Sequence, residues 1–419
     1  MLVTEPSPSG RGLGEGKGRP TLLFISPRFL FPTDEGGKIR TSNILRQMKN
    51  GAFHIILASP APPDAEAYEA DLATICDQFH GWPATPASTL RRLAALLDPR
   101  PVSVATDDTP QGQAAVANLL KATPDLLLID FPHAAVLAPA PFRIPSVIFT
   151  HNVEAEIYER HARLARFPMR LLWPAQARKM QRFEGETLRR FDRVIAVSKR
   201  DAKALQSRFD LPGVDPIDTG VDLEFFQPTL HPPQPEPGAG TIVFTGVMDS
   251  PANIEGVRTL ITEIWPILTR TRPNARAVIV GRNPPDSLKT AAPPSITFTG
   301  TVDDIRPHVA AAHLAVIPLE VGSGTRIKAF EAMAMGRPVV STTIGVEGLD
   351  VIDNEHLLIA DTPATFAAAI DRLLSDPTLR TTLATNARAL VEQRFSWAHV
   401  ARQFEAICLK ALSPGERVG

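Results

Sequence analysis

The 419-residue chain has few cysteines, little net charge and no long apolar run, and each shortage excludes a class of protein. Its two cysteines, Cys76 and Cys408, are too few and too far apart for a disulfide framework or a zinc site. A reducing cytoplasm is the setting that such a chain favours. The net charge of -1 makes nucleic acid an unexpected partner. No apolar run approaches the ~20 residues of a membrane-spanning helix.

The N-terminal residues 1–19 are rich in glycine, proline and charge and lack the apolar middle of a signal peptide. We expect them to form a disordered leader, because they have too few apolar side chains to build a core. The remaining 400 or so residues exceed one ordinary core, so two domains of about 200 residues each are expected.

Short runs rich in Ile, Val and Leu alternate with helical patterns twice along the chain. Strands that are apolar throughout and separated by helices indicate a parallel sheet covered on both faces, the doubly wound α/β arrangement. In the first round a helical pattern covers residues 64–79. The strands expected in that round are 21–26, 54–59, 125–130, 146–150 and 193–198.

A segment dense in proline and glycine, residues 227–240, separates the two rounds and predicts a linker. The first domain is therefore expected over residues 20–226 and the second over 241–395, with a last helix over 396–419 packing back on the first domain. Two such domains would face each other across a central cleft, where ligands bind at the carboxyl ends of the strands. The strands expected in the second round are 241–246, 275–281, 295–300, 314–319, 338–343 and 356–361.

The stretch "EVGSGTRIKAFEAMAMGRPVV", residues 320–340, places small residues and then two cations at the start of a helix. Gly322 and Gly324 would let the backbone approach a ligand closely after a buried strand. The helix start near Thr325 is a natural anion site, and Arg326 and Lys328 add positive charge there.

Glu331, three residues after Lys328, lies on roughly the same face of that helix, where a carboxylate could accept hydrogen bonds from ribose hydroxyls. A bound nucleotide diphosphate would explain both cations and the carboxylate. The alternative is a solvated Lys–Glu pair on an ordinary surface helix.

Together with this stretch, several motifs in chain order resemble those of retaining glycosyltransferases of the GT-B fold, family 4. The resemblance covers about residues 21 to 412. It implies a nucleotide-diphosphate sugar as co-substrate, front-face attack with retention and no required metal or other cofactor. It also implies a glycan or lipid-linked acceptor in exopolysaccharide or cell-envelope biosynthesis. The motifs are "FPTDEGGKIRT" (31–41), "FTHNVE" (149–154), "VSKRDAKAL" (197–205), "IDTGVDLEFF" (217–226), "FTGVMDSPANIEGV" (244–257), "VGRNPP" (280–285), "FTGTVDDI" (298–305), "EAMAMGRPVVSTTIGVEGL" (331–349) and "RFSW" (394–397).

The sequence departs from that family's signature at two places. The family has two glutamates eight residues apart; Glu331 fits the second, whereas Ser323 stands where the first would be. The loop that starts at Gly246, which in the family lies beside the donor and often carries an Arg and a Lys for its phosphates, has neither. We infer that Arg326 and Lys328 take over the diphosphate, and that Ser323 or backbone groups contact the sugar.

The resemblance assigns three further positions. Gly36 and Gly37 would lie against the donor phosphates and the acceptor, unless they form a plain strand–helix turn. His151 would lie near the transferred sugar, where a histidine can donate to hydroxyls or share a proton; alternatively it merely packs in a capping loop. Arg282 would contact the nucleobase or a phosphate, or be an ordinary surface arginine.

Residues 160–193 carry ten Lys and Arg against three acids, with apolar and aromatic side chains among them. Such a surface suits an anionic membrane, although helices packed on the first sheet with an arginine-rich solvent face explain it equally. The protein is thus expected in the cytoplasm, with a peripheral position at the inner face of the membrane left open. Two other functions also stay open: a nucleotide-sugar epimerase of the same fold and a non-catalytic nucleotide-sugar-binding subunit.

Overall fold

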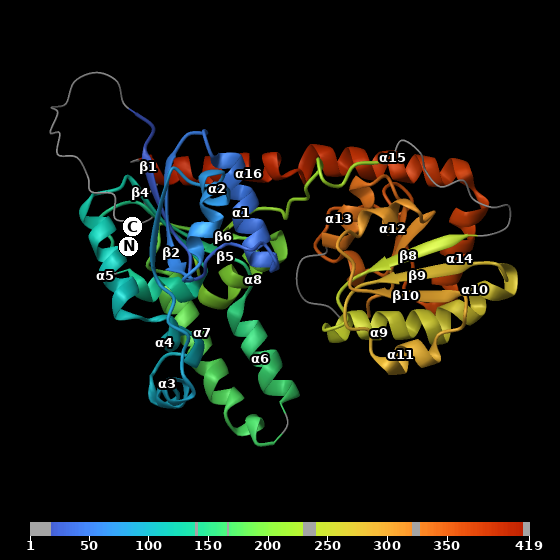
Figure 1. Ribbon diagram of the computed structural model, residues 1–419, viewed down its shortest axis with the longest axis horizontal. Coiled ribbons are helices and arrows are strands. Elements are labelled where there is room, and N and C mark those ends of the chain that lie inside the picture. Colours follow the sequence, from blue (N-terminus) through green and yellow to red (C-terminus); the bar gives the residue numbers. More distant parts are fainter. Residues whose placement is uncertain (1–17, 139–140, 166, 229–239, 321–326, 414–419) are drawn as a thin grey trace.

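The computed structural model describes residues 18–138, 141–165, 167–228, 240–320 and 327–413, which form two α/β domains (Figure 1). Nearly all of the expected leader and most of the expected linker lie outside the described residues. Both sheets have their strands at the centre and helices on both faces, so the prediction of two doubly wound domains is confirmed.

The first domain has a seven-stranded sheet in the order β3-β2-β1-β4-β5-β6-β7, and every neighbouring pair is parallel. Its strands are β1 (Thr21–Ile25), β2 (His54–Ala61), β3 (Gln78–Pro83), β4 (Leu126–Asp130), β5 (Ser146–Thr150), β6 (Arg193–Ala196) and β7 (Asp215–Pro216). Its α-helices are α1 (Gly36–Met48), α2 (Glu69–Ala73), α3 (Thr89–Ala94), α4 (Val102–Asp107), α5 (Pro110–Lys121), α6 (Glu154–Leu164), α7 (Trp173–Leu188) and α8 (Lys199–Phe209).

The prediction of a helix over residues 64–79 is wrong for the second half of this range. The helical part ends at Ala73, and β3 begins at Gln78 and pairs in parallel with β2. The strand contains Gly81 and ends at Pro83, residues that weaken a strand and confine it to the edge of a sheet. Pairing with β2 decides the structure here, because no apolar run in the sequence indicates a strand.

The second domain has a six-stranded parallel sheet in the order β10-β9-β8-β11-β12-β13. Its strands are β8 (Thr241–Thr245), β9 (Arg276–Val280), β10 (Ile296–Gly300), β11 (Leu314–Ile317), β12 (Val339–Ser341) and β13 (Leu358–Ile359). Its α-helices are α9 (Pro251–Thr259), α10 (Trp265–Thr271), α11 (Asp286–Ala291), α12 (Arg306–Ala310), α13 (Ile327–Ala334), α14 (Pro363–Ser375) and α15 (Pro377–Arg394), and α16 (Trp397–Leu412) follows.

Helix α16 leaves the second domain and joins the core of the first (Figure 1). Its Phe404 ring meets the Phe149 ring of β5 edge-on at 5.1 Å, and Trp397 is also buried in that core. A second connection runs beside it, since the Val221 amide donates to the Phe395 carbonyl oxygen at 2.7 Å. The chain therefore crosses between the domains twice at one place, which sets how the two sheets face each other.

Candidate active site

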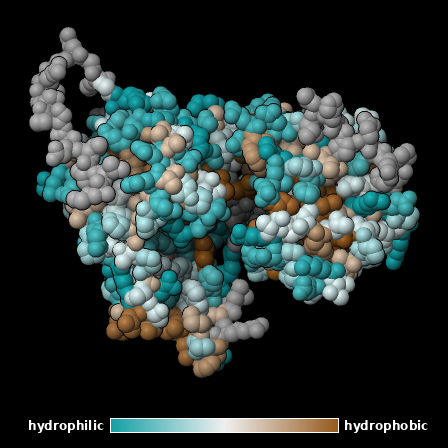
Figure 2. Space-filling model, in the orientation of Figure 1, coloured by the Kyte–Doolittle hydropathy of each residue, from teal (hydrophilic) through white to brown (hydrophobic). Residues whose placement is uncertain are grey.

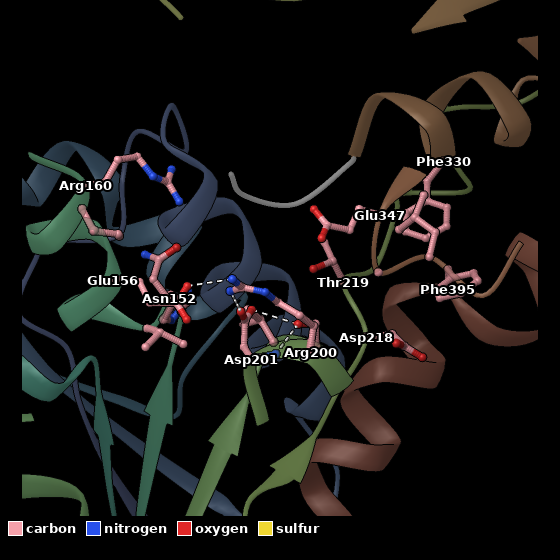
Figure 3. Close-up of a pocket in the computed structure, with 17 residues that line it drawn as sticks. Asn152, Glu156, Arg160, Arg200, Asp201, Asp218, Thr219, Phe330, Glu347 and Phe395 are labelled. Carbon is pink, nitrogen blue, oxygen red and sulfur yellow. Dashed lines mark hydrogen bonds and ion pairs between the residues drawn. The ribbon is translucent and has the colours of Figure 1, made fainter. Parts of the chain in front are cut away.

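A cavity of about 280 Å³ lies between the two domains and receives side chains from both (Figure 3). The first domain lines it with the loop after β5 and with α6, including Asn152, Glu156 and Arg160. The second domain contributes Phe330 of α13 and the segment that begins at Glu347. The cavity thus lies at the carboxyl end of the first sheet, the place where such folds bind ligands.

His151 follows β5 and lines this cavity, but both of its ring nitrogens are bonded within the protein. Its Nδ1 is 3.0 Å from the Arg40 guanidinium, and its Nε2 is 2.6 Å from Asp130 Oδ1. Because an arginine can only donate, Nδ1 accepts and Nε2 carries the proton that is donated to Asp130. Burial lowers the pKa of His151, which favours this neutral imidazole.

The bonds of His151 belong to a larger buried network. Arg40 of α1 also donates to Thr219 Oγ1 at 3.1 Å, and burial lowers the pKa of Arg40 to about 10. Asp130, at the end of β4, accepts from Thr41 Oγ1 at 3.1 Å through its second oxygen. The network thus joins the ends of β4 and β5, helix α1 and the segment around Thr219 that leads to the second domain. His151 could donate to a sugar hydroxyl only if one of these bonds opened, so its direct role stays a prediction.

Gly37 lies in the first turn of α1 and is packed tightly against the ring of Phe131. A Cβ atom at Gly37 would lie 2.9 Å from Phe131 Cζ, so any larger residue would have to displace this ring. The Phe131 ring stacks on the His151 ring at 3.9 Å. Phe131 has a φ of +64°, which is unfavourable for an aromatic residue and marks strain at this strand end. Gly36, by contrast, has nothing near its Cβ position, and both glycines line a neighbouring cavity of about 390 Å³.

In the second domain, Lys328 of α13 reaches the carboxyl end of β8. Its Nζ is 2.7 Å from Asn253 Oδ1 and lies over the Phe244 ring at 4.4 Å from the centroid. A Cβ atom at Gly246 would lie 2.8 Å from Asn253 Nδ2 and 3.0 Å from Lys328 Nζ. The lysine ammonium therefore lies beside the loop that starts at Gly246, which has no Arg or Lys of its own. Glycine at position 246 leaves space for the ammonium group.

Glu331 lies one turn beyond Lys328 on α13. Burial raises the pKa of Glu331 to about 7, although the charge of Lys328 lowers it in part. A carboxyl group with this pKa changes its charge near neutral pH. The two hydroxyl groups of a bound ribose could therefore form hydrogen bonds with Glu331 in either its protonated or its charged form. Its proposed contact with ribose stays a prediction.

Arg282 follows β9, and its side chain is paired with Asp249 at 3.1 Å rather than extended alone. The pKa of Asp34, in the glycine loop of the first domain, is lowered first by the hydrogen bond from Lys38 and to a smaller extent by the charge of Arg282. The glycine loop of the first domain and the Arg282 loop of the second thus face each other. The remaining predicted donor positions, Gly322, Ser323, Gly324, Thr325 and Arg326, lie outside the described residues.

Three participants were not anticipated: Arg40, Asp130 and Asn253. Asp130 is the last residue of the expected strand 125–130, and a carboxylate that ends a buried strand is a signal that could have been used. Arg40 and Asn253 sit inside motifs that were recognised, but their partners lie 111 and 75 residues away in sequence. Spacing alone does not indicate contacts at that separation.

Two family models match the chain, each over one domain. Residues 35–225 match the model described as Glycosyltransferase Family 4, and residues 239–376 match the one described as Glycosyl transferases group 1. Each half of the chain is therefore similar to glycosyltransferases of one of these two descriptions. The matched boundary falls in the expected linker, and each match contains one half of the site described above.

Curated relatives match parts of the chain. A D-inositol 3-phosphate glycosyltransferase of Nocardioides is 28% identical over 52% of this chain and 54% of its own length. An uncharacterized glycosyltransferase of Methanocaldococcus jannaschii is 32% identical over 36% of this chain and 40% of its own length. The chain spans about half or less of the length of the curated relatives it matches.

Solved structures match over nearly the whole chain. Sucrose-phosphate synthase from Thermosynechococcus elongatus has a TM-score of 0.67 at 17% identity and covers 93% of this chain and 98% of its own. Anabaena Alr3699/HepE, solved in complex with UDP and glucose, has a TM-score of 0.62 at 18% identity and covers 93% and 100%. At these identities the likeness establishes the GT-B fold and nothing further.

Proposed function

We propose that the protein is a glycosyltransferase that moves a sugar from a nucleotide-diphosphate donor to a glycan or lipid-linked acceptor, with retention of the anomeric configuration. The observation that carries the proposal is the position of the Lys328 ammonium beside Gly246, at the carboxyl end of the strand that opens the second domain. A cation held there by Asn253 suits the diphosphate of a nucleotide sugar, because charge-assisted bonds to phosphate are strong.

In the proposed reaction, the donor diphosphate leaves while the acceptor hydroxyl attacks from the same face and passes its proton to the departing phosphate oxygen. The protein then has to position both substrates and stabilise the charge that develops on the diphosphate. Lys328 does this from α13, together with Arg326, which lies outside the described residues. Because these cations supply the positive charge, the proposal requires no metal ion.

Glu331 is proposed to accept hydrogen bonds from the ribose of the donor, one helical turn from Lys328. The acceptor is proposed to enter the cavity beside Asn152 and Arg160, which the first domain lines. We place the reaction in the cytoplasm, as part of exopolysaccharide or cell-envelope glycan synthesis. Both cysteines are unpaired and buried in the described structure, which suits a reducing compartment.

A thermal-shift screen of UDP-, GDP-, ADP- and dTDP-sugars tests the proposal, since a ligand that binds only the folded protein raises its apparent stability. We expect one base to raise the melting temperature clearly more than the others. The matching donor sugar is then incubated with glycan and lipid-linked acceptors. An α-linked product from an α-linked donor supports retention. Stabilisation by none of the four, or formation of an epimer without any acceptor, would contradict the proposal.

A further inference from the structure

Exposed apolar side chains are concentrated at one end of the first domain. Of the twelve large apolar side chains that are well exposed in the described part of the chain, seven lie there. Figure 2 shows the resulting brown area at the lower end of the first domain, where Figure 1 places α3 and the turn between α6 and α7. We call this set the apolar tip: Leu90, Leu93, Leu97, Phe167, Met169, Leu171 and Leu172.

The side chains of the apolar tip are more than half exposed at several positions, with Leu97 at 91% and Phe167 at 73%. Single exposed leucines are normal on a soluble protein, but a contiguous apolar surface of this kind marks an interaction site. Leu90, Leu93 and Leu97 recur at helical spacing, a pattern that would face a core if the helix had one to face. The structure turns this face outward.

The two segments that carry the apolar tip contain basic side chains but no acidic ones. No aspartate or glutamate occurs between residues 86 and 97 or between residues 160 and 183. The exposed arginines are Arg92, Arg163, Arg170 and Arg178. None of these four forms an ion pair with a described acidic side chain. The tip therefore combines an apolar centre with four arginines that pair with no described acidic side chain.

The two segments of the apolar tip are held together by polar contacts rather than by the apolar side chains themselves. Lys179 of α7 donates to the carbonyl oxygens of Leu96 at 2.8 Å and Asp98 at 2.6 Å, at the end of the α3 segment. Trp173 stacks on His161 at 4.6 Å and thereby closes the α6–α7 turn. These contacts hold the two segments in place in the unbound protein, so the exposed leucines have a fixed position.

We propose that the apolar tip docks on an anionic lipid bilayer. Leucine and phenylalanine side chains would enter the interface while the arginines contact anionic headgroups, as amphipathic membrane-binding surfaces do. A second copy of this chain is a poorer occupant, because two-fold pairing would bring the same arginines of both copies together and they would repel each other. Arg163 and Arg170 lie within the segment that the sequence marked as basic, whereas the α3 leucines were not anticipated.

Docking would also bring the bilayer close to the cavity between the domains. Arg160 lines that cavity, and the end of α6 at Leu164 is one helical turn away, roughly 6 Å along the axis. This consequence rests on the proposed function, since it assigns the cavity to an acceptor. It favours an acceptor that is anchored in the membrane. The docking itself does not depend on the transferase reaction.

Co-sedimentation of the full chain with vesicles of phosphatidylcholine, with and without phosphatidylglycerol, tests the proposal. We expect binding to the anionic vesicles, weakened by added salt, and little binding to phosphatidylcholine alone. Leu97→Asp combined with Leu171→Asp should weaken binding on the order of tenfold or more. Ile352→Asp, which changes an exposed apolar side chain of the second domain, should bind as the wild type does.

Thermal shifts with the nucleotide sugar separate this proposal from the proposed function. The double variant should show the same rise in melting temperature with the nucleotide sugar as the wild type, because the apolar tip lies apart from Lys328 and Glu331. A folded double variant that loses vesicle binding but keeps this rise supports docking. Failure of the wild-type protein to co-sediment with anionic vesicles would overturn the proposal. A dimer in size-exclusion chromatography that the double variant converts to monomer would also overturn it, since the tip would then be a contact between copies.

Discussion

Lys328 Nζ lies 2.7 Å from Asn253 Oδ1, and this contact joins the helix after β11 to the helix after β8. The two residues are 75 positions apart in sequence. Through this bond, a lysine from the region of the family signature reaches a loop that carries no lysine or arginine of its own. The proposed donor site is thus completed by a cation that arrives from a neighbouring element.

Removing the amide of Asn253 tests whether it positions the lysine. Asn253→Ala should weaken binding of a nucleoside diphosphate by about threefold to tenfold, because Lys328 loses a hydrogen bond of roughly 1 kcal/mol that orients it. In a double-mutant cycle with Lys328→Ala, the two losses should be clearly less than additive. Fully additive losses, measured by isothermal titration calorimetry, would show that the amide acts independently of the lysine.

Adding a methyl group at Gly246 should disturb the same place from the backbone side. Gly246→Ala puts a Cβ atom within 3.0 Å of both Asn253 and Lys328, so one of them has to move. We expect nucleotide affinity to fall at least fivefold or so, by analogy with loss of a charged hydrogen bond. Gly213→Ala is the matched control, since nothing lies within 4 Å of its Cβ position. Equal affinity of both variants would rule out this crowding.

The carboxyl group of Glu331 predicts a dependence of stability on pH. Its pKa is raised from 4.5 to about 7 by burial, so the folded protein keeps a proton that the unfolded chain releases in that window. The free energy of unfolding should therefore fall as pH rises from 4.5 to 7, by about 1–3 kcal/mol from this group. Urea unfolding at several pH values measures the slope.

Glu331→Gln carries no titrating group at this position, so its unfolding free energy should lose that part of the slope. Glu184 is buried too, and its pKa is raised to about 8, so it adds a slope of the same sign that both proteins share. An identical slope in wild type and variant would mean that Glu331 titrates as an ordinary glutamate.

The buried network around His151 predicts a joint loss of stability and turnover. Asp130→Asn removes the carboxylate charge that faces Arg40 and holds His151, so the buried Arg40 cation loses the larger of the two carboxylate charges, Asp130 and Asp201, that stabilise it. We expect destabilisation by about 3 kcal/mol and a lower kcat with little change in nucleotide affinity. The exposed Asp71→Asn serves as control. A variant of wild-type stability would contradict the assigned network.

Much of the fold could be predicted because parallel strands buried on both faces appear as uninterrupted apolar runs. β4, β5 and β11 are of this kind. β3 could not be predicted, because its sequence mixes His80, Gly81 and Pro83, and only pairing with β2 makes it a strand. Edge strands owe their structure to a neighbour rather than to their own pattern.

The candidate site was predicted in part for a related reason. Strand ends can be located from sequence, and His151 and Gly246 directly follow such ends, whereas Gly37 lies in the first turn of the helix after β1. Which side chains contact each other at these ends depends on packing. The hydrogen bond from Arg40 to His151 and the contact of Asn253 with Lys328 could therefore be found only from the structure. The α3 leucines had the spacing of a core-facing helix, and only the structure shows that their face is exposed.

Isothermal titration calorimetry with wild type and Lys328→Ala measures whether Lys328 binds the diphosphate of the donor. The titrant is the nucleoside diphosphate that stabilises the wild type most in the thermal-shift screen. Lys289→Ala, which changes an exposed lysine paired with Asp286 on α11, is the control. Lys328→Ala should lose roughly tenfold to a hundredfold in affinity, while Lys289→Ala should keep the wild-type affinity. Equal affinity of Lys328→Ala and wild type would mean that Lys328 does not bind the donor diphosphate.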